Sequence, residues 1–347
     1  MKVLVTGAFG NVGTYAVDEL LSRGATVRCL DIPSSMSKRK ARPYAGKVEI
    51  IWGDIRNTEA VARVVQGADA IVHLAFIIPP KSEQRPVWAE TINVGGTWNL
   101  LQAALASKSR PRIVFSSSIA LYGRTQHLAP PRKADELLHP YEDYAYHKMT
   151  CEHMLHASGL PWVILRFGAV PPIEFGELDP LMFEVRMDDR MEYLAPMDAG
   201  AAVAAAAMLP GLEGKTLMVA GGPSCQVTGR QFMQRSFDAL GIGMLPESAF
   251  SQTPFHCDFM DTEESERLLH YQHYSFDETL ALQRRTLGWK KLFVPIARPF
   301  IRRKLLAMSP YYKRHSGQEA PKASSGPVRV IPSIVDRSNG ARSRIKA

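Results

Sequence analysis

The chain has 347 residues, 46% of them apolar, which is enough to build a buried core in one large or two modest domains. No apolar run approaches the roughly 20 residues that cross a bilayer, and a strand-like pattern begins directly at the N-terminus, so a cytoplasmic protein is expected. The charge of +8 is uneven: residues 284–347 hold 16 Lys or Arg against 2 acids (+14), which leaves −6 on residues 1–283. This argues against a nucleic-acid-binding body and suggests an anionic partner for the basic tail.

The four cysteines are scattered, without a CxxC pair or a His/Cys cluster. We therefore expect reduced thiols, with no disulfide framework and no metal site.

Strand-like and helix-like segments alternate through the first half of the chain. In order they are "KVLV", a helix near 11–23, "TVRCLD", "KVEIIWGD", "DAIVHLA", a helix near 88–107, "RIVFSSS", a helix near 141–158 and "WVILRF". This alternation, with Val/Ile/Leu-rich runs, predicts an α/β fold with a Rossmann-type doubly wound parallel sheet.

The second half is less regular. Pro-rich loops precede an Ala-rich helix near 198–209, a strand at "KTLMVAGG" and a helix near 229–240. We expect these to form a smaller C-terminal substrate lobe over one edge of the sheet. The predicted units are a dinucleotide-binding domain (1–170), a substrate-binding lobe interleaved with it (171–290) and a basic, partly disordered tail (291–347), with disorder from about Lys313.

The first strand leads into "TGAFGNVG" and then a helix. Gly7 suits a tight turn, Gly10 lets a pyrophosphate approach the backbone, and Gly13 lets helix and strand pack closely. The N–H groups of this helix start, including those near Asn11 and Val12, then face the phosphates. The alternative is a tight turn that binds nothing.

Asp31 ends the second strand, eighteen residues after Gly13. A carboxylate there accepts hydrogen bonds from the adenosine ribose and repels a 2′-phosphate, which favours NAD over NADP. Arg28 and the run "SKRK" (37–40) keep NADP as the less favoured cofactor, and a solvated strand end is the structural alternative.

The spacing TGxxGxxG, followed by "GDIRN", "HLAF", "NVGGTWNLL", "SSSIALYG" and "YAYHK", resembles the short-chain dehydrogenase/reductase superfamily. The motif set resembles its extended branch, the NAD-dependent epimerase/dehydratase family and its 3β-hydroxysteroid dehydrogenase-like relatives. The resemblance is strong to about residue 166 and weak to about residue 287. It implies a homodimer built on the helices near Trp88 and Tyr141.

The same resemblance assigns further cofactor contacts. It implies that Asp54 and Ile55 border the adenine, that the backbone at Leu74 and Ala75 passes the cofactor, and that Asn93 lies on the cofactor side.

Tyr144 and Lys148 are four residues apart on a predicted helix, so their side chains share one face. A neighbouring ammonium and the positive nicotinamide ring are both expected to stabilise the phenolate and lower the pKa of the phenol, which would let Tyr144 exchange a proton with a substrate oxygen. The resemblance implies that Lys148 also holds the nicotinamide ribose.

Ser118 ends the predicted fifth strand, at the carboxyl edge where parallel sheets bind ligands. Its hydroxyl can donate to the substrate oxygen and stabilise developing charge. The alternative is that the three serines 116–118 only satisfy turn backbone. The resemblance selects Ser118 and, with Tyr144 and Lys148, implies hydride transfer at a carbinol carbon.

Two departures from the family pattern bear on the substrate. Ile119 and Ala120 stand where sugar-nucleotide dehydratases carry an acidic pair, and Ala169 stands where sugar-nucleotide enzymes present an asparagine. The expected Arg two residues before an aromatic is also missing, since Met191 takes that place and Arg190 lies one step away. An unpaired diphosphate is costly to desolvate, so we expect a substrate that is not a sugar nucleotide.

The segment "WKKLFVPIARPFIRRKLLAMSPYYKR" mixes apolar residues with cations. It predicts an amphipathic element for peripheral contact with an anionic membrane, which would favour a sterol- or isoprenoid-like substrate. Equally, it can pack against the body or an identical subunit.

The leading expectation is an NAD-dependent oxidoreductase acting on a secondary alcohol or ketone. The enzyme alternative is an epimerase that retains NAD. The alternative of another class is a cofactor-binding sensor or scaffold protein.

Overall fold

The structure, a computed structural model, describes residues 1–174 and 180–315. Its strands are β1 (Lys2–Thr6), β2 (Thr26–Asp31), β3 (Glu49–Trp52), β4 (Ala70–His73), β5 (Arg112–Ser118), β6 (Trp162–Phe167), β7 (Arg190–Glu192), β8 (Lys215–Val219) and β9 (Gln226–Thr228). Seven of them form one parallel sheet in the order β3-β2-β1-β4-β5-β6-β8. The order reverses between β1 and β4, the switch point at which such sheets bind ligands. The predicted Rossmann-type doubly wound sheet is confirmed.

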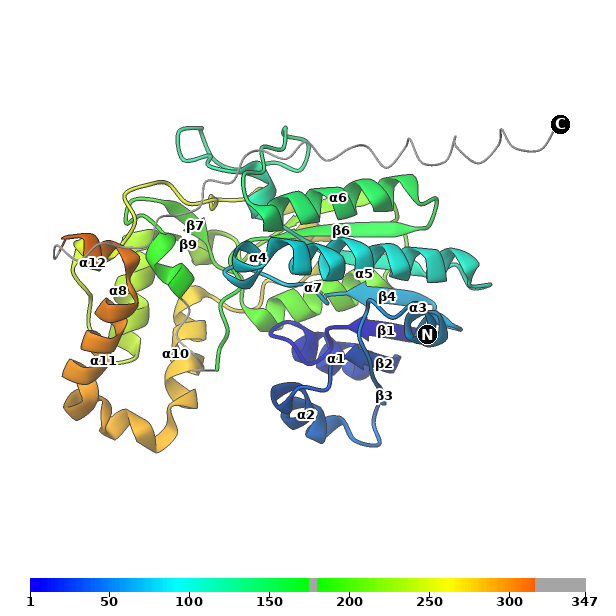
Figure 1. Cartoon of the computed structure of the whole chain (residues 1–347), viewed down its shortest axis with the longest axis horizontal. Coiled ribbons are helices and arrows are strands. Elements are labelled where there is room, and N and C mark those ends of the chain that lie inside the picture. Colours follow the sequence, from blue (N-terminus) through cyan, green and yellow to red (C-terminus); the bar gives the residue numbers. More distant parts are fainter. Residues whose placement is uncertain (175–179, 316–347) are drawn as a thin grey trace.

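Helices cover both faces of this sheet (Figure 1). They are α1 (Gly13–Ser22), α2 (Ser35–Ala41), α3 (Thr58–Val65), α4 (Lys81–Gln84), α5 (Pro86–Ala106), α6 (Asp143–Ala157), α7 (Pro196–Met208), α8 (Gly229–Ala239), α9 (Glu263–Leu269), α10 (Phe276–Thr286), α11 (Val294–Met308) and α12 (Pro310–His315). Short 3₁₀ turns are η1 (Arg42–Tyr44), η2 (Ile119–Tyr122), η3 (Pro180–Glu184), η4 (Pro223–Cys225), η5 (Glu247–Ala249) and η6 (Gly288–Leu292). Buried side chains of α1 and α7 join one face of the sheet, and those of α3, α5 and α6 join the other.

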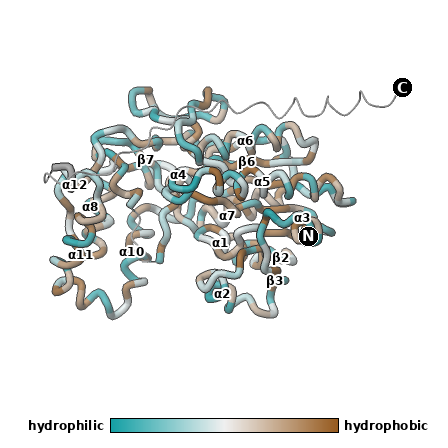
Figure 2. Tube along the Cα trace, viewed as in Figure 1, coloured by the Kyte–Doolittle hydropathy of each residue, from teal (hydrophilic) through white to brown (hydrophobic). Residues whose placement is uncertain are grey.

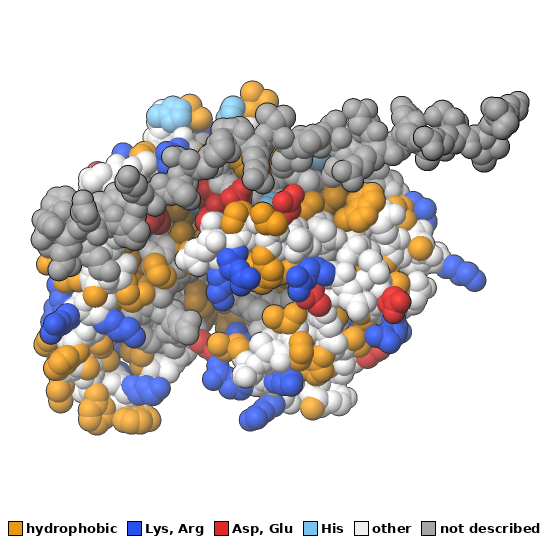
Figure 3. Space-filling model, viewed as in Figure 1, with side chains coloured by type: hydrophobic (Ala, Val, Ile, Leu, Met, Phe, Trp, Pro, Cys, Tyr) orange, Lys and Arg blue, Asp and Glu red, His pale blue; other side chains and the backbone are white. Residues whose placement is uncertain are grey.

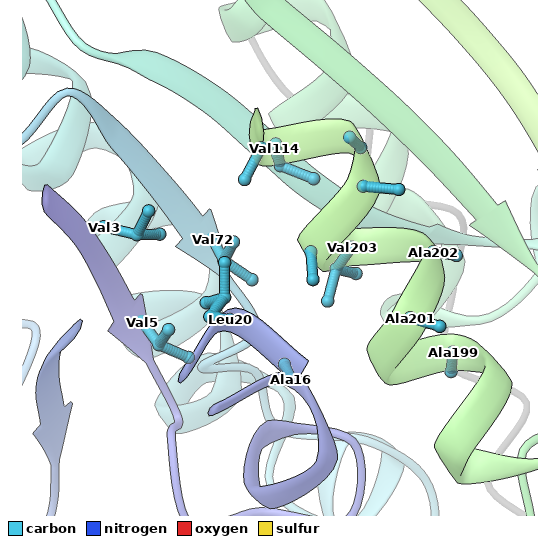
Figure 4. Close-up of a cluster of buried hydrophobic side chains, with 14 of the residues drawn as sticks. Val3, Val5, Ala16, Leu20, Val72, Val114, Ala199, Ala201, Ala202 and Val203 are labelled. Carbon is cyan, nitrogen blue, oxygen red and sulfur yellow. The ribbon is translucent and has the colours of Figure 1, made fainter. Parts of the chain in front are cut away.

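The Ala-rich helix and the strand after it differ in place from the sequence-based expectation. Both were expected in the smaller lobe, but β8 pairs in parallel with β6 as the seventh strand, and α7 packs beside α1 on the sheet. Figure 4 shows Val203 of α7 and Leu20 of α1 in the cluster that covers Val5 and Val72. Alanine gives α7 little side-chain bulk, so this helix can lie close to its neighbours.

The smaller lobe is built on the antiparallel pair β7–β9 and the helices α8 and α10 to α12. Its apolar cluster includes Phe183, Tyr193, Phe250 and Phe276, all almost fully buried. Figure 2 shows hydrophobic stretches along the central strands and also at the outer turn between α10 and α11.

The predicted amphipathic segment contains a helix, α11, which continues through Pro299. Disorder was predicted from about Lys313. The chain is described to His315, at the end of α12, and residues 316–347 lie outside the described residues. Within the described ranges, every helix is too short or too polar to traverse a lipid bilayer.

Candidate active site

The glycine turn after β1 is tightly packed. Gly7 has φ +67°, and a Cβ there would lie 2.8 Å from the backbone nitrogen of Ala75. A Cβ on Gly13 would lie 2.3 Å from the carbonyl oxygen of Gly7, while the Gly10 N–H donates to that same oxygen at 3.0 Å. The cap residue Val12 provides no side-chain hydrogen bond to α1. The helix start therefore keeps N–H groups for an anion.

Asn11 joins this turn to the segment after β6. Its Nδ2 donates to the carbonyl oxygen of Val170 at 2.9 Å. This bond fixes the turn relative to the carboxyl edge of the sheet.

Asp31 lies against the same turn. One carboxylate oxygen accepts from the Phe9 N–H at 2.8 Å and the other from the Ile32 N–H at 2.7 Å. Burial raises the pKa of this carboxyl, and the two backbone hydrogen bonds oppose the rise. Each oxygen retains acceptor capacity, as a ribose-binding carboxylate requires.

Arg28, one of the cations that left NADP as an alternative cofactor, is bonded to other groups of the protein. Arg28 Nε pairs with Glu49 at 2.7 Å, and its Nη1 donates to the carbonyl oxygens of Val64 and Gln66. Lys38 and Arg39 of α2 remain exposed. Arg28 therefore has no free fork for a 2′-phosphate.

The residues expected around the adenine make contacts of their own. Asp54 holds Arg56 through a 2.6 Å ion pair that lowers the pKa of the carboxyl. Ile55 is buried, and a Cβ on Gly96 of α5 would lie 2.4 Å from its Cγ2. Their contact with adenine stays a prediction.

Asn93 is fully buried and forms two hydrogen bonds with the loop after β4. Its Oδ1 accepts from the Ile77 N–H at 2.7 Å and its Nδ2 donates to the Ile77 carbonyl at 2.9 Å. Leu74 and Ala75 begin this loop, with the Leu74 N–H donating to the Thr6 carbonyl at 3.1 Å. Asn93 thus acts on the loop that abuts Gly7.

Ser118, Tyr144 and Lys148 are brought together beside this loop. The Ser118 hydroxyl lies close enough to the Tyr144 hydroxyl to lower the pKa of the phenol, and the Tyr144 ring meets the Phe76 ring edge-on at 5.8 Å. Lys148 Nζ lies 3.6 Å from the Phe76 ring centroid and donates to the carbonyl oxygen of Ser116. Since Phe76 directly follows Ala75, one short segment connects the trio to the glycine turn.

The electrostatics of the trio differ from the sequence-based expectation. Lys148 was expected to lower the pKa of Tyr144, but burial dominates and raises it to about 12, with the hydrogen bond from Ser118 opposing the rise. Burial also lowers the pKa of Lys148 to about 7. The sequence argument failed because spacing says nothing about how much water reaches either group.

Glu83 of α4 is a residue that sequence reasoning missed. Its two carboxylate oxygens accept from the backbone N–H groups of Asp143 and Tyr144, at 3.1 and 3.0 Å. It thereby supplies the negative end charge that α6, which has no side-chain cap of its own, favours at its N-terminus. No local signal marks it, because the partners are 60 and 61 positions apart.

A buried ion pair fixes the middle of α6. Arg166 of β6 meets Glu152 through two bonds of 3.0 and 2.7 Å and also donates to the Tyr122 hydroxyl at 2.6 Å. This pair ties the helix bearing Tyr144 and Lys148 to the sheet.

The substrate side offers few groups for a diphosphate. Ala169 bridges to Tyr193, and Arg190 forms a two-bond ion pair with Asp258 at 2.7 and 3.1 Å. Arg190 also donates to the Leu128 carbonyl at 2.9 Å, so its guanidinium is engaged within the lobe. A separate groove of about 740 Å³ near Pro130 and Gln272 includes none of the trio. Among the described residues, no group of three or more His, Cys, Asp or Glu could hold a metal ion.

A glycine turn thus lies at the switch point of a parallel sheet, with Ser118, Tyr144 and Lys148 at its carboxyl edge, the arrangement expected from the resemblance to the extended short-chain dehydrogenases/reductases. Residues 3–170 match the model of the NAD dependent epimerase/dehydratase family.

Curated relatives match over part of their length. A UDP-glucose 4-epimerase of Lactobacillus helveticus is 33% identical over 174 residues, which are 48% of this chain and 51% of that protein. A 3 beta-hydroxysteroid dehydrogenase/Delta 5-->4-isomerase of Mycobacterium tuberculosis (strain ATCC 25618 / H37Rv) is 32% identical over 192 residues, 52% of this chain and 49% of that protein. The chain thus spans about half the length of the curated relatives it matches.

Solved structures share the fold over most of the chain. UDP-glucose 4-epimerase of Thermotoga maritima with UDP-glucose has a TM-score of 0.70 at 21% identity, covering 84% of this chain and 100% of that one. UDP-glucose 4-epimerase of Thermus thermophilus, in complex with NAD, has a TM-score of 0.66 at 23% identity, covering 83% and 99%.

Proposed function

We propose that the protein is an NAD-dependent oxidoreductase of the extended short-chain type, acting on a secondary alcohol or ketone that is not a sugar nucleotide. One observation carries this proposal. Gly7 packs against the backbone of Ala75, and the next residue, Phe76, contacts both Tyr144 and Lys148. A binding site for phosphates and a proton-transfer group thereby share one wall.

The residues present fit NAD. Gly7, Gly10 and Gly13 leave room and N–H groups for the pyrophosphate, and Asp31 keeps acceptor capacity for a ribose. Bound NAD supplies the hydride acceptor or donor. The negative charge of Asp31 and the engagement of Arg28 favour NAD over NADP.

Tyr144 exchanges the proton with the substrate oxygen. A phenol with a pKa raised to about 12 is neutral at pH 7 and can donate its proton to a ketone oxygen during reduction. Oxidation of an alcohol requires the phenolate, which the Ser118 hydroxyl stabilises by hydrogen bonding. During reduction, when the phenol is neutral, Ser118 can instead donate its one hydroxyl proton to the substrate oxygen as charge develops there.

The substrate proposal rests on the lobe side of the site. With Ala169 in place of an amide and Arg190 engaged by Asp258, a diphosphate would be desolvated without a partner. An apolar alcohol or ketone, sterol- or isoprenoid-like, carries no such cost.

An epimerase that retains NAD is the second candidate, and it is favoured by the several UDP-glucose 4-epimerases among the relatives. It uses the same trio but returns the hydride to the opposite face of the substrate. Turnover without added cofactor would support the epimerase, whereas dependence on added NAD(H) would support the dehydrogenase.

We also propose a homodimer built on α5 and α6, in the cytoplasm. Trp98 of α5 is 47% exposed and would be buried by such an interface. Light scattering should give a dimer for the full chain and a monomer for Trp98→Glu.

The experiment that tests the function is a screen of alcohols and ketones with NAD(H) and NADP(H), followed at the reduced nicotinamide absorbance band. Oxidation or reduction of an apolar substrate with NAD(H) supports the proposal. Activity confined to UDP-sugars would overturn the substrate assignment.

A further inference from the structure

A row of large apolar side chains is exposed on η6 and α11. Trp289, Leu292, Phe293, Ile296 and Phe300 are 55 to 76% exposed. Their steps of three, one, three and four residues place them on one side of a helical path, and the Trp289 and Phe293 rings meet edge-on at 5.6 Å. Figure 3 shows hydrophobic side chains gathered here, over the turn between α10 and α11, with Lys and Arg beside them. We call these five residues the apolar face.

The lobe fixes which side of α11 points outward. Leu305 is fully buried and Ile301 packs against the lobe cluster. Arg298 Nε donates to the Ile242 carbonyl at 2.9 Å, and Arg302 donates to the carbonyl oxygens of Gly243 and Met244 at 2.7 Å each. These contacts hold one side of α11 against the lobe, so the apolar face on the opposite side of the helix points outward.

The stretch of chain that carries this face has charges of one sign only. Residues 279–315 contain ten Lys or Arg and no Asp or Glu. Arg298 and Arg302 are engaged with backbone, but the exposed side chains of Lys290, Lys291 and Lys304 make no hydrogen bond or ion pair with any described residue. Exposed, unpaired cations thus lie in the same segment as the apolar face (Figure 3).

We propose that the apolar face is a docking surface for an anionic lipid bilayer. A second copy placed symmetrically on it would bring cations against cations with no acidic partner, which opposes self-association. A bilayer interface accepts both parts, because the acyl boundary receives the apolar side chains and anionic head groups receive the ammonium groups. The inference goes beyond the proposed function and does not depend on it.

Flotation of the purified full chain tests this, with vesicles of equal parts phosphatidylcholine and phosphatidylglycerol compared with phosphatidylcholine alone. We expect binding to the anionic vesicles that weakens with salt. Leu292→Ser/Ile296→Ser/Phe300→Ser should lower the partition coefficient at least about tenfold, and Lys290→Gln/Lys291→Gln should lower it about fivefold per cation. The matched control is Val87→Ser/Leu137→Ser, which alters side chains 65 and 80% exposed on other elements.

Full-chain protein that stays unbound with anionic vesicles overturns the proposal, as does a triple variant that binds like the wild type. If light scattering shows the triple variant converting a dimer to a monomer, the face is a self-interface instead. If the wild type binds poly-glutamate as tightly as vesicles, and the triple variant keeps both, the surface binds acidic protein. Circular dichroism and thermal unfolding verify that all variants remain folded.

Discussion

Glu83 Oε1 accepts a 3.0 Å hydrogen bond from the backbone N–H of Tyr144, so a carboxylate from α4 caps the helix that carries the proton-transfer group. Glu83→Ala removes both cap bonds and the negative charge. We expect the free energy of unfolding to fall by about 1 kcal/mol and kcat to fall with little change in the Kd of NADH. Urea unfolding and initial rates measure the two effects. Glu90→Ala, at an exposed position on α5, is the control. An equal response to both substitutions would contradict the role of Glu83 as the cap of α6.

Tyr144→Phe deletes only the hydroxyl that exchanges the proton. We expect kcat/KM to fall about 10²- to 10⁴-fold while NADH binding, followed by fluorescence, stays unchanged. Tyr146→Phe is the matched control two positions along the same helix and should behave as wild type. A protein acting only as a cofactor sensor or scaffold would be indifferent to both changes.

Asp31→Asn keeps the size of the side chain at the end of β2, removes its charge and replaces one acceptor oxygen by an NH2 donor. Repulsion of a 2′-phosphate then disappears, so the ratio of kcat/KM for NAD to that for NADP should fall about tenfold, which corresponds to about 1.4 kcal/mol. Steady-state kinetics with both cofactors measure this ratio. An unchanged preference would place the discrimination elsewhere.

Lys148 makes stability depend on pH in a defined direction. Its pKa falls from 10.5 in the unfolded chain to about 7 when buried, so between these values the unfolded state binds more protons. Its contribution therefore makes stability rise with pH across this window, by at most about 1.4 kcal/mol per unit, and below pH 7 the full cost of burying the ammonium remains. Urea unfolding at several pH values should give a flatter profile for Lys148→Met; an identical slope would speak against a depressed pKa.

The buried pair of Arg166 and Glu152 should be costly to break. Glu152→Gln leaves the guanidinium buried without its carboxylate, and we expect a loss of about 3–5 kcal/mol. The exposed pair Lys215–Glu264, at 2.8 Å, is the comparison, and Glu264→Gln should cost at most about 1 kcal/mol. Similar losses in the two variants would mean that burial does not set the cost.

Features that depend on a few neighbouring residues could be predicted from the sequence. The run before Gly7, the glycine spacing and the pair Tyr144–Lys148 are local, because strand burial, turn geometry and helix periodicity act over a few residues. The structure brings the Ser118 hydroxyl close to Tyr144, and the roles that the resemblance implied for both residues stay proposals.

Features that depend on tertiary placement could not be predicted. Pro-rich loops interrupt the alternation of strands and helices after β6. The sequence pattern therefore did not show that β8 joins the main sheet beside β6. Glu83 lies on a four-residue helix far in sequence from its partners. The pKa of Tyr144 is governed by burial, a quantity that residue spacing does not contain.

The central claim is that this chain transfers hydride between NAD and a substrate carbon beside Tyr144. The most direct measurement incubates the full chain with NADH carrying deuterium at the reactive nicotinamide carbon and a panel of ketones, then analyses the alcohols by mass spectrometry. The account predicts one deuterium in the product alcohol with the wild type, and formation of this labelled alcohol at least about 10²-fold slower with Tyr144→Phe. Products without deuterium across the panel, together with epimerisation of a substrate in the absence of added cofactor, would contradict it.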